Sequence, residues 1–490
     1  MGKTMLEGVM QSVTRWKNLA REASSTRLSP RRAMWMMWGV MVAVLATTSL
    51  AAFAQEATVT AAKAAPFKAD GADTAWVLVS AALVLLMTPG LAFFYGGLVR
   101  SKNMLNTLLM SFGAMAVMAM VWFVAAYSIA FGSIGDTVDG KFVASAANDY
   151  WGGLQHLFLN GVGVTDAHPL AATIPHQAFM IFQMMFFIIT PALISGSLVE
   201  RMKFGPYLAF IALWGLLVYA PVAHWVWNGG FIGAKLDVLD FAGGAVVHVN
   251  AGFAALAGAL ALKPRRGYNE TSMRPHNLPF CLLGVGLLWF GWYGFNAGSA
   301  LGSGALATVA FVNTTLGAAA AMFGWMMIDL ITKKEITALG AGTGAVAGLV
   351  GITPACGFVT PGGAILVGLI TTGVCYVMAT LRAKGPVDDS LDAFAVHGVG
   401  GFTGAVLTGI FSSEALKTAG VSPYAVAGGL EQAWKQLLGT GIVAVYSFVV
   451  SFILFKILQA VMGLRASEEA EQRGLDVALH GEEAYAESAG

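Results

Sequence analysis

The chain has 490 residues, of which 57% are hydrophobic and 11% are charged, and its formal net charge is +1. This composition is typical of a protein that crosses a membrane several times, and it argues against an ordinary soluble domain. The balanced charge gives no reason to expect nucleic acid as a partner, because no basic block stands out beyond the first few dozen residues.

The N-terminal segment has the features of a secretory signal. Basic residues precede an apolar run, Ala33–Leu50, and the run is followed by an A-x-A site that ends at Ala54. We therefore predict that residues 1–54 are a cleavable signal peptide and that the mature N-terminus lies outside the cytoplasm. The alternative is an additional uncleaved helix, because the charged region is longer than usual.

Runs of about twenty apolar residues follow, and their lengths suit membrane-spanning helices. We expect an all-α polytopic membrane protein with eleven transmembrane helices. The expected spans are Ala75–Leu98, Leu105–Phe131, Ile174–Val199, Pro206–Trp225, Phe241–Leu262, Leu278–Ser299, Ala305–Ile331, Ile336–Ile352, Gly363–Ala379, Ala393–Phe411 and Ala433–Met462.

Positive charges in the loops test the orientation, because cytoplasmic loops retain Lys and Arg. With the N-terminus outside, the cytoplasmic loops contain far more Lys and Arg than the outer loops, which contain only Lys141, Lys235, Lys417 and Lys435. An odd number of helices then places the C-terminus in the cytoplasm. We expect a multi-pass protein of the cell inner membrane.

Two intramembrane histidines lie in matching surroundings. His248 and His397 each follow an aspartate by eight residues, and a glycine and a phenylalanine come four and five residues after each histidine. An ionisable residue within a membrane span is costly and is usually functional. The pattern indicates one structural unit used twice.

The predicted topology orients the two copies of this unit in opposite directions across the membrane. Asp240 would lie at the outer end of the fifth span, and Asp389 near the inner end of the tenth. Such an arrangement is typical of an inverted repeat with a site near the bilayer midplane. Eight residues of regular helix rise about 12 Å, which puts both histidines at mid-bilayer depth. Two neutral imidazoles can then share a hydrogen bond, although two separately satisfied core histidines remain the alternative.

Several longer motifs carry a resemblance to a known family. They are D-F-A-G-G-A-V-V-H-V-N and F-A-V-H-G-V-G-G around the histidines, P-G-L-A-F-F-Y-G-G-L-V-R at Pro89–Arg100, G-W-Y-G-F-N-A-G-S-A at Gly291–Ala300 and P-H-N-L-P at Pro275–Pro279. From about Trp76 to Tyr485 the chain resembles the Amt/Mep/Rh ammonium transporters, and the Amt branch most closely. The resemblance implies an eleven-helix bundle with an inverted repeat of helices 1–5 and 6–10, and a homotrimer with one pore per subunit.

The resemblance also implies roles for individual residues. Trp227, Phe182 and Ser299 match the outer vestibule that binds the substrate, and Phe186 and Phe295 match two gate rings. His248 and His397 match the pore histidines, and Trp292 a tryptophan beside them. An alternative alignment register would place Phe179 instead of Phe182 in the vestibule, but it would put Gln183 at the position of the gate phenylalanine. Asp240 would support deprotonation at the mouth or would cap its helix, and the sequence leaves both roles open.

These residues predict a chemistry for ammonium. Aromatic rings attract a cation by up to about 2 kcal/mol when it is desolvated, whereas a full charge in the apolar pore costs several kcal/mol or more. Separation of the proton from neutral ammonia is therefore favoured, with the histidines as proton carriers. We favour net electrogenic NH4+ uptake over a neutral ammonia channel, with methylammonium as an analogue of the substrate.

The remaining predictions concern the domains and the partners. Residues 55–463 would form the membrane domain, and residues 464–490 a cytoplasmic regulatory tail. The stretch G-L-D-x-x-x-H-G-E-x-A-Y in this tail resembles the family segment that takes part in blocking by PII signalling proteins. A carbon dioxide channel or an ammonium sensor would use nearly the same residues.

We expect no enzyme activity, because a hydrolase pattern such as G-x-S-x-G does not surround the histidines. We expect no cofactor or metal, because the three cysteines share no metal-like spacing.

Overall fold

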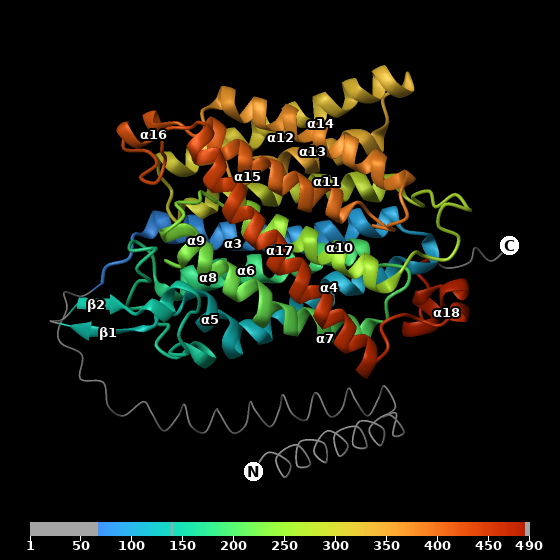
Figure 1. Cartoon of the computed structure of the whole chain (residues 1–490), viewed down its shortest axis with the longest axis horizontal. Helices are drawn as coiled ribbons and strands as arrows, with labels where there is room; N and C mark the ends of the chain where they lie inside the picture. The colour runs from blue at the N-terminus through green and yellow to red at the C-terminus, as the bar shows by residue number, and fades with distance from the viewer. Residues whose placement is uncertain (1–66, 139–140, 486–490) are drawn as a thin grey trace, which may run out of the picture. The chain divides into compact units, whose positions relative to one another are not determined.

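The computed structural model describes residues 67–138 and 141–485, and Figure 1 shows the arrangement of their helices. These residues all belong to one structural unit, Thr60–Gly490. The predicted signal peptide, residues 1–54, lies outside the described residues.

The described chain is almost entirely helical. Its α-helices are α3 (Gly71–Leu98), α4 (Met104–Val121), α5 (Tyr127–Phe131), α6 (His176–Ile194), α7 (Phe204–Trp214), α8 (Ala220–Trp227), α9 (Phe231–Ala234), α10 (Asn250–Leu262), α11 (Leu278–Ala297), α12 (Ala305–Lys333), α13 (Ala338–Ile352), α14 (Pro361–Lys384), α15 (Gly400–Phe411), α16 (Glu414–Thr418), α17 (Leu430–Val461) and α18 (Glu468–Arg473). One antiparallel strand pair, β1 (Gly135–Val138) and β2 (Lys141–Ala144), lies in the loop after α5.

Shorter helical turns of other types connect or extend these helices. The π-helical turns are η2 (Trp122–Ala126), η6 (Gly215–Tyr219), η7 (Gly244–Val249), η9 (Phe394–Val399) and η10 (Asp476–His480). The 3-10 turns are η1 (Ser101–Asn103), η3 (Ala146–Asp149), η4 (Leu157–Leu159), η5 (Ser195–Ser197) and η8 (Gly298–Ala300).

Ten helical segments of the described chain are long and apolar enough to cross a membrane, and each coincides with a predicted span. The remaining predicted span corresponds to α13, which has only 15 residues. At 1.5 Å per residue it is about 22 Å long, shorter than the roughly 30 Å of a bilayer core. The all-α membrane class is confirmed, while the count of eleven crossings and the inverted repeat stay predictions.

Glycines allow the helices to pack closely, as is common where small residues line helix contacts in membranes. A Cβ atom on Gly284 of α11 would lie 2.3 Å from the backbone nitrogen of Phe94 on α3, and one on Gly90 of α3 would lie 2.9 Å from the Cβ of Leu287. The long helix α17 packs against α10 and α15 and crosses them obliquely in Figure 1.

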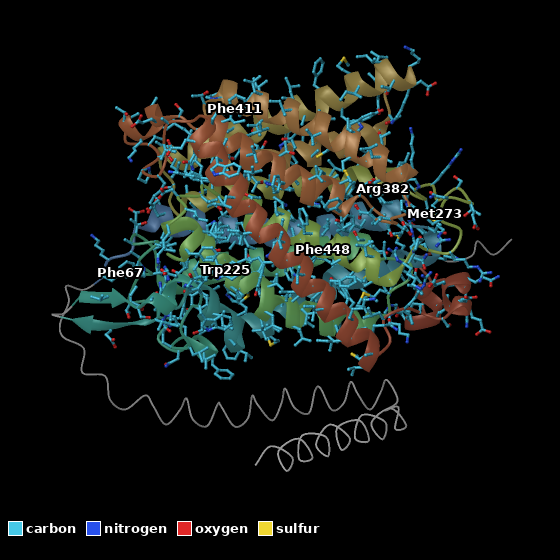
Figure 2. All side chains as sticks on the ribbon, viewed as in Figure 1. Phe67, Trp225, Met273, Arg382, Phe411 and Phe448 are labelled. Atoms are coloured by element: carbon cyan, nitrogen blue, oxygen red, sulfur yellow. The ribbon has the colours of Figure 1, made fainter. Side chains whose placement is uncertain are left out.

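Large apolar side chains on the outside of the helices indicate contact with lipid. Phe290 is 57% exposed, Phe323 59% and Ile453 51%, and Figure 2 shows such side chains along the helices. The end with β1, β2, α9 and α16 lies opposite the end with α18 and the loop of residues 263–277 (Figure 1). Following the charge-based prediction, we call these two ends the outer end and the inner end.

Candidate functional site

The two predicted pore histidines lie together inside the bundle. His248 belongs to η7 and His397 to η9, and their Nδ1 atoms are 3.2 Å apart. The ring centroids are 5.3 Å apart with an angle of 22° between the planes, and the residues are 1% and 3% exposed. At this distance one neutral ring donates its Nδ1–H and the other accepts it. The pair is thus linked by a hydrogen bond.

Each histidine segment begins with a capped backbone. The carboxylate of Asp240 accepts hydrogen bonds from the backbone N–H groups of residues 243–246, at 2.6 to 3.1 Å. The carboxylate of Asp389 accepts them from residues 393–395, at 2.9 to 3.3 Å, and also accepts the hydroxyl of Ser197. Because the first N–H groups of a helix lack partners within the helix, both aspartates stabilise the start of their segments.

The repeated glycines explain how the two segments come so close. A Cβ atom on Gly252 would lie 2.1 Å from the backbone nitrogen of Gly398, which follows His397. A Cβ atom on Gly401 would lie 2.8 Å from the Cβ of His248. Each glycine therefore makes room for the segment that carries the other histidine, and this contact is reciprocal.

The local backbone differs from the regular helix expected from the sequence. The helical structure begins at Gly244 rather than Phe241, because Gly243 has a φ of 116°, a conformation that favours glycine. Both histidines then lie in π-helical turns, which are frequent at functional sites. The rise of a regular α-helix therefore does not describe the segment from Asp240 to His248.

A continuous series of aromatic rings connects the histidine pair to the outer end. The ring of Phe182 lies 5.0 Å from that of Phe186, and Phe186 lies 4.3 Å from Phe295. Phe295 lies 5.8 Å from His248. The three phenylalanines are at most 1% exposed, so the rings of Phe186 and Phe295 are closely packed and buried beside the histidine pair.

The predicted vestibule residues lie at the outer part of this series. Trp227 is half-buried, its ring lies 6.1 Å from that of Phe186, and its Nε1 donates to the carbonyl of Asp240 at 2.9 Å. The half-buried hydroxyl of Ser299 donates to the carbonyl of Phe295 at 2.8 Å. Its oxygen lone pairs can still accept a hydrogen bond.

Trp292 supports the histidine pair from the side. Its ring stacks on His248 with the centroids 5.4 Å apart and an angle of 22° between the planes. Its Nε1 donates to the hydroxyl of Thr353 at 2.8 Å. This contact fixes the orientation of the indole ring, and the indole in turn restricts the imidazole.

Two cavities meet at His397. The first, which we call the lumen, has a volume of about 10 Å3 and includes both histidines and Phe295. The second, the inner cavity, has a volume of about 320 Å3 and opens at the inner end. Phe94, Val346 and His397 line both cavities. A volume of 10 Å3 is about the minimum for one water molecule, so the lumen accommodates a single small molecule.

The sequence did not reveal the apolar wall of the lumen. This wall consists of Met87, Leu91, Phe94, Ile189, Leu193, Leu288 and Val346. The helices that supply these residues are apolar all round, so no periodicity distinguishes a residue that lines a pore from one that faces another helix or lipid.

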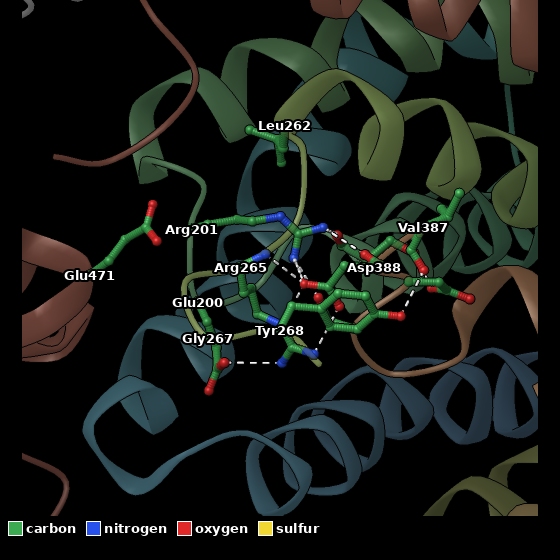
Figure 3. Close-up of polar contacts among 12 residues, drawn as sticks. Glu200, Arg201, Leu262, Arg265, Gly267, Tyr268, Val387, Asp388 and Glu471 are labelled. Atoms are coloured by element: carbon green, nitrogen blue, oxygen red, sulfur yellow. Dashed lines mark hydrogen bonds and ion pairs between the residues drawn. The ribbon is translucent and has the colours of Figure 1, made fainter. Parts of the chain in front are cut away.

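Buried ion pairs surround the inner end of the path (Figure 3). Arg265 bonds the carboxylates of Asp388 at 2.8 and 2.9 Å and of Glu200 at 3.0 Å, and Arg201 lies 3.4 Å from Asp388. Burial would raise the pKa of both carboxyls. For Glu200, the charge of Arg265 outweighs the effect of burial, and for Asp388 the hydrogen bonds from Arg265 outweigh it. The pKa values of both carboxyls therefore lie below their ordinary range. The cluster is therefore fully ionised near neutral pH.

The chain is similar to known proteins over most of its length. The sequence matches the profile of the Ammonium Transporter Family over residues 75–485. An ammonium transporter of Mycobacterium bovis is 47% identical over 436 residues, which cover 85% of this chain and 90% of that relative.

Solved structures share the same architecture. The crystal structure of Saccharomyces cerevisiae Mep2 aligns with a TM-score of 0.75 at 34% identity, and the match covers 82% of this chain and 88% of Mep2. The structure of a sensor Amt protein aligns with a TM-score of 0.75 at 29% identity, covering 84% of this chain and 98% of that protein.

Proposed function

The chain belongs to the ammonium transporter family, and from this membership we propose how it moves its substrate. It is an ammonium transporter and a multi-pass membrane protein, and it is not an enzyme. We propose that NH4+ binds at the outer vestibule, loses its proton, and crosses the lumen as ammonia while the two histidines carry the proton. The observation that carries this proposal is the 3.2 Å contact between His248 and His397 beside a lumen that accommodates one small molecule.

The outer vestibule supplies weak and selective binding. The rings of Trp227 and Phe182 attract a cation by up to about 2 kcal/mol when it is desolvated. The oxygen of Ser299, whose own proton points to the carbonyl of Phe295, accepts a hydrogen bond from an N–H of ammonium. Potassium has no proton to donate, so this contact favours ammonium.

The gate is where charge becomes costly. Phe186 and Phe295 lie 4.3 Å apart and are both 1% exposed, and a cation that passed between them would lose its water without gaining ligands. The cost is several kcal/mol or more. Transfer of the proton to a water molecule in the outer vestibule, from which the imidazole of His248 takes it up, converts the cation into neutral ammonia, for which the apolar wall is no comparable barrier.

The two histidines then transfer the proton by exchanging the roles of hydrogen-bond donor and acceptor. A proton that arrives on His248 leaves through the Nδ1–Nδ1 hydrogen bond to His397, which borders the inner cavity. Ammonia and the proton reach the inner end separately and recombine there, so net NH4+ and one positive charge cross the membrane. We assign Asp240 the structural role, because four backbone N–H groups already occupy its carboxylate.

The test is the current evoked by an ammonium jump on proteoliposomes of the full chain adsorbed to a supported membrane. We expect a current in the wild type and its loss in His248→Ala. The matched control is His156→Ala, which removes a half-buried histidine of the outer loop and leaves the current intact. Uptake of methylammonium without any current in the wild type would refute the proton relay.

The similarity to a sensor Amt protein favours one second candidate function, that of an ammonium sensor. Uptake of labelled methylammonium by the same proteoliposomes distinguishes the two functions. A chain that binds the analogue but does not accumulate it would be a sensor.

The location and the partners extend the proposal. We propose a homotrimer in the cell inner membrane, with the N-terminus outside after signal cleavage and the C-terminus in the cytoplasm. The tail supports a docking role at the inner end, because Asp476 accepts hydrogen bonds from the backbone N–H groups of Leu105 and Asn106 at 3.0 and 2.8 Å. A PII-type signalling protein that binds this tail would cover the exits of the pores.

A further inference from the structure

We propose that Asp392, held by Arg382 on the wall of the inner cavity, is the carboxylate that receives the transported proton from His397 and passes it to the cytoplasm. This inference rests on the proton relay of the proposed function and identifies its last member. The proton leaves an imidazolium N–H of His397, crosses water in the cavity, and forms an O–H bond on Asp392. It then passes to ammonia or water at the inner end.

The inner cavity brings the two groups together. His397 and Asp392 both line this cavity of about 320 Å3, which has room for several water molecules. Of the described residues that line it, Asp392 alone carries a carboxyl group. Its side chain is 26% exposed, so water in the cavity can reach it.

The neighbouring carboxylates are already occupied. Asp389 caps η9 and accepts the hydroxyl of Ser197, whereas Asp388 and Glu200 are held by the arginines of the cluster in Figure 3. They do not line the cavity. A proton that leaves His397 therefore reaches Asp392 before any of the three.

Asp392 has one free oxygen. Both contacts with Arg382, at 2.8 Å from Nε and 2.6 Å from Nη2, involve Oδ1. Among the described residues, no group donates a hydrogen bond to Oδ2. One oxygen thus anchors the side chain, and the other is available for a proton.

The backbone also holds Asp392 in an uncommon conformation. Its φ is 59°, in the left-handed region, and its carbonyl accepts the N–H of Val396 at 2.8 Å. Few residues other than glycine adopt this conformation, although Asp and Asn do so more readily than most. Asp392→Asn therefore removes the proton acceptor while it preserves the backbone preference and the size of the side chain.

The ionisable surroundings favour proton exchange. Burial raises the pKa of the Asp392 carboxyl, and the charge of Arg382 opposes this rise. The negative charge of Asp389 raises the pKa further, so the pKa of Asp392 lies above its ordinary value. A carboxyl whose pKa is raised toward the pH of the cell exchanges protons more effectively. The other ionisable groups that face it are Cys375 from α14, Tyr95 from α3, Arg265 and Tyr268 from the loop of residues 263–277, and His397.

The experiment compares Asp392→Asn with Asp237→Asn. Asp237 also has a positive φ, of 52°, and a cation partner, Lys435 at 3.3 Å, but it lies at the outer end. In proteoliposomes buffered at the same pH on both sides, we expect Asp392→Asn to reduce the maximal ammonium-evoked current about tenfold or more. The ammonium concentration for half-maximal current should not change, because the outer vestibule is intact, and Asp237→Asn should behave as the wild type.

Arg382→Gln provides a second readout that a purely structural role would not affect. Loss of the guanidinium removes the charge that stabilises the carboxylate, so the decline of the current on acidification should begin at a higher pH. Wild-type current in Asp392→Asn would overturn the inference and leave the relay intact. An unshifted pH profile in Arg382→Gln would overturn it even if Asp392→Asn failed to fold. Methylammonium uptake without current in the wild type would instead refute the relay itself.

Discussion

A single methyl group at the crossing of the two histidine segments should reduce the ammonium-evoked current at least tenfold. In Gly252→Ala the new Cβ would lie 2.1 Å from the nitrogen of Gly398 and 2.2 Å from its Cα, whereas ordinary contacts begin at 3.4 Å. Both obstructing atoms are backbone atoms, so the two segments must separate by more than about 1 Å. The Nδ1 atoms of His248 and His397, now 3.2 Å apart, would then be too far apart for a hydrogen bond.

The expected effect on activity is large and the effect on folding moderate. A displacement of about 1 Å within a reacting group can reduce a rate by about a hundredfold, whereas one additional methyl group in a packed interior costs about 1–3 kcal/mol. We therefore expect a folded protein with a lower thermal midpoint and an ammonium-evoked current reduced at least tenfold. Both are measured on the same preparation, by thermal unfolding in detergent and by current in proteoliposomes.

Two other glycine substitutions separate this effect from a general intolerance of alanine. At Gly286 on α11 and Gly373 on α14, an added Cβ would have no neighbouring atom within 4 Å. Alanine at these helical positions should leave the current unchanged and stabilise the helices slightly, because alanine has the higher helix propensity. Wild-type current in Gly252→Ala would refute the claim that the close crossing is needed for the relay.

Two further predictions concern the outer vestibule and the inner ion pairs. Ser299→Ala removes one acceptor for ammonium, worth about 1 kcal/mol, so the concentration for half-maximal current should rise about fivefold while the maximal current stays the same; an unchanged concentration would contradict the vestibule role. Asp388→Asn should lower the thermal midpoint at pH 7. The pKa of Asp388 in the folded protein is depressed below its ordinary value of 3.8. The charged Asp388 therefore stabilises the folded state fully above this ordinary pKa, and this stabilisation is lost as the pH falls through the pKa of the folded protein. The difference in midpoint between wild type and Asp388→Asn should therefore shrink on acidification, and a difference that stays constant would contradict the ionised cluster.

The sequence predicted those features that depend on composition and on local repetition. Ten spans follow from apolar runs of sufficient length, because lipid requires the backbone to satisfy its own hydrogen bonds. The matched spacing of Asp240, His248 and Gly252 indicated a repeated unit. In the structure the aspartate caps the segment, the histidine supplies one ring of the pair, and the glycine leaves room for the crossing segment.

The features that the sequence did not predict depend on contacts between distant segments. The π-helical turns of His248 and His397 leave no pattern in the chain, because the residues are as apolar as those of a regular span. The inner cavity requires α3, the loop of residues 263–277 and α14 to meet. Asp392 lies only five residues before His397 in the sequence, yet only its place on the cavity wall and its pairing with Arg382 distinguish it from Asp389.

The sizes of the compartments determine where charge can exist along the path. The lumen, at about 10 Å3, excludes a cation with even part of its water shell, whereas the inner cavity, at about 320 Å3, admits water again. Sodium and potassium cannot become neutral, so under the proposed mechanism the closed rings of Phe186 and Phe295 would be a barrier of full desolvation for them. Ammonium alone among these cations can cross as a neutral molecule, provided that a separate group carries its proton. On the proposed mechanism, selectivity therefore comes from the histidine pair and the apolar lumen together, and a tight cation site at the outer end is not required.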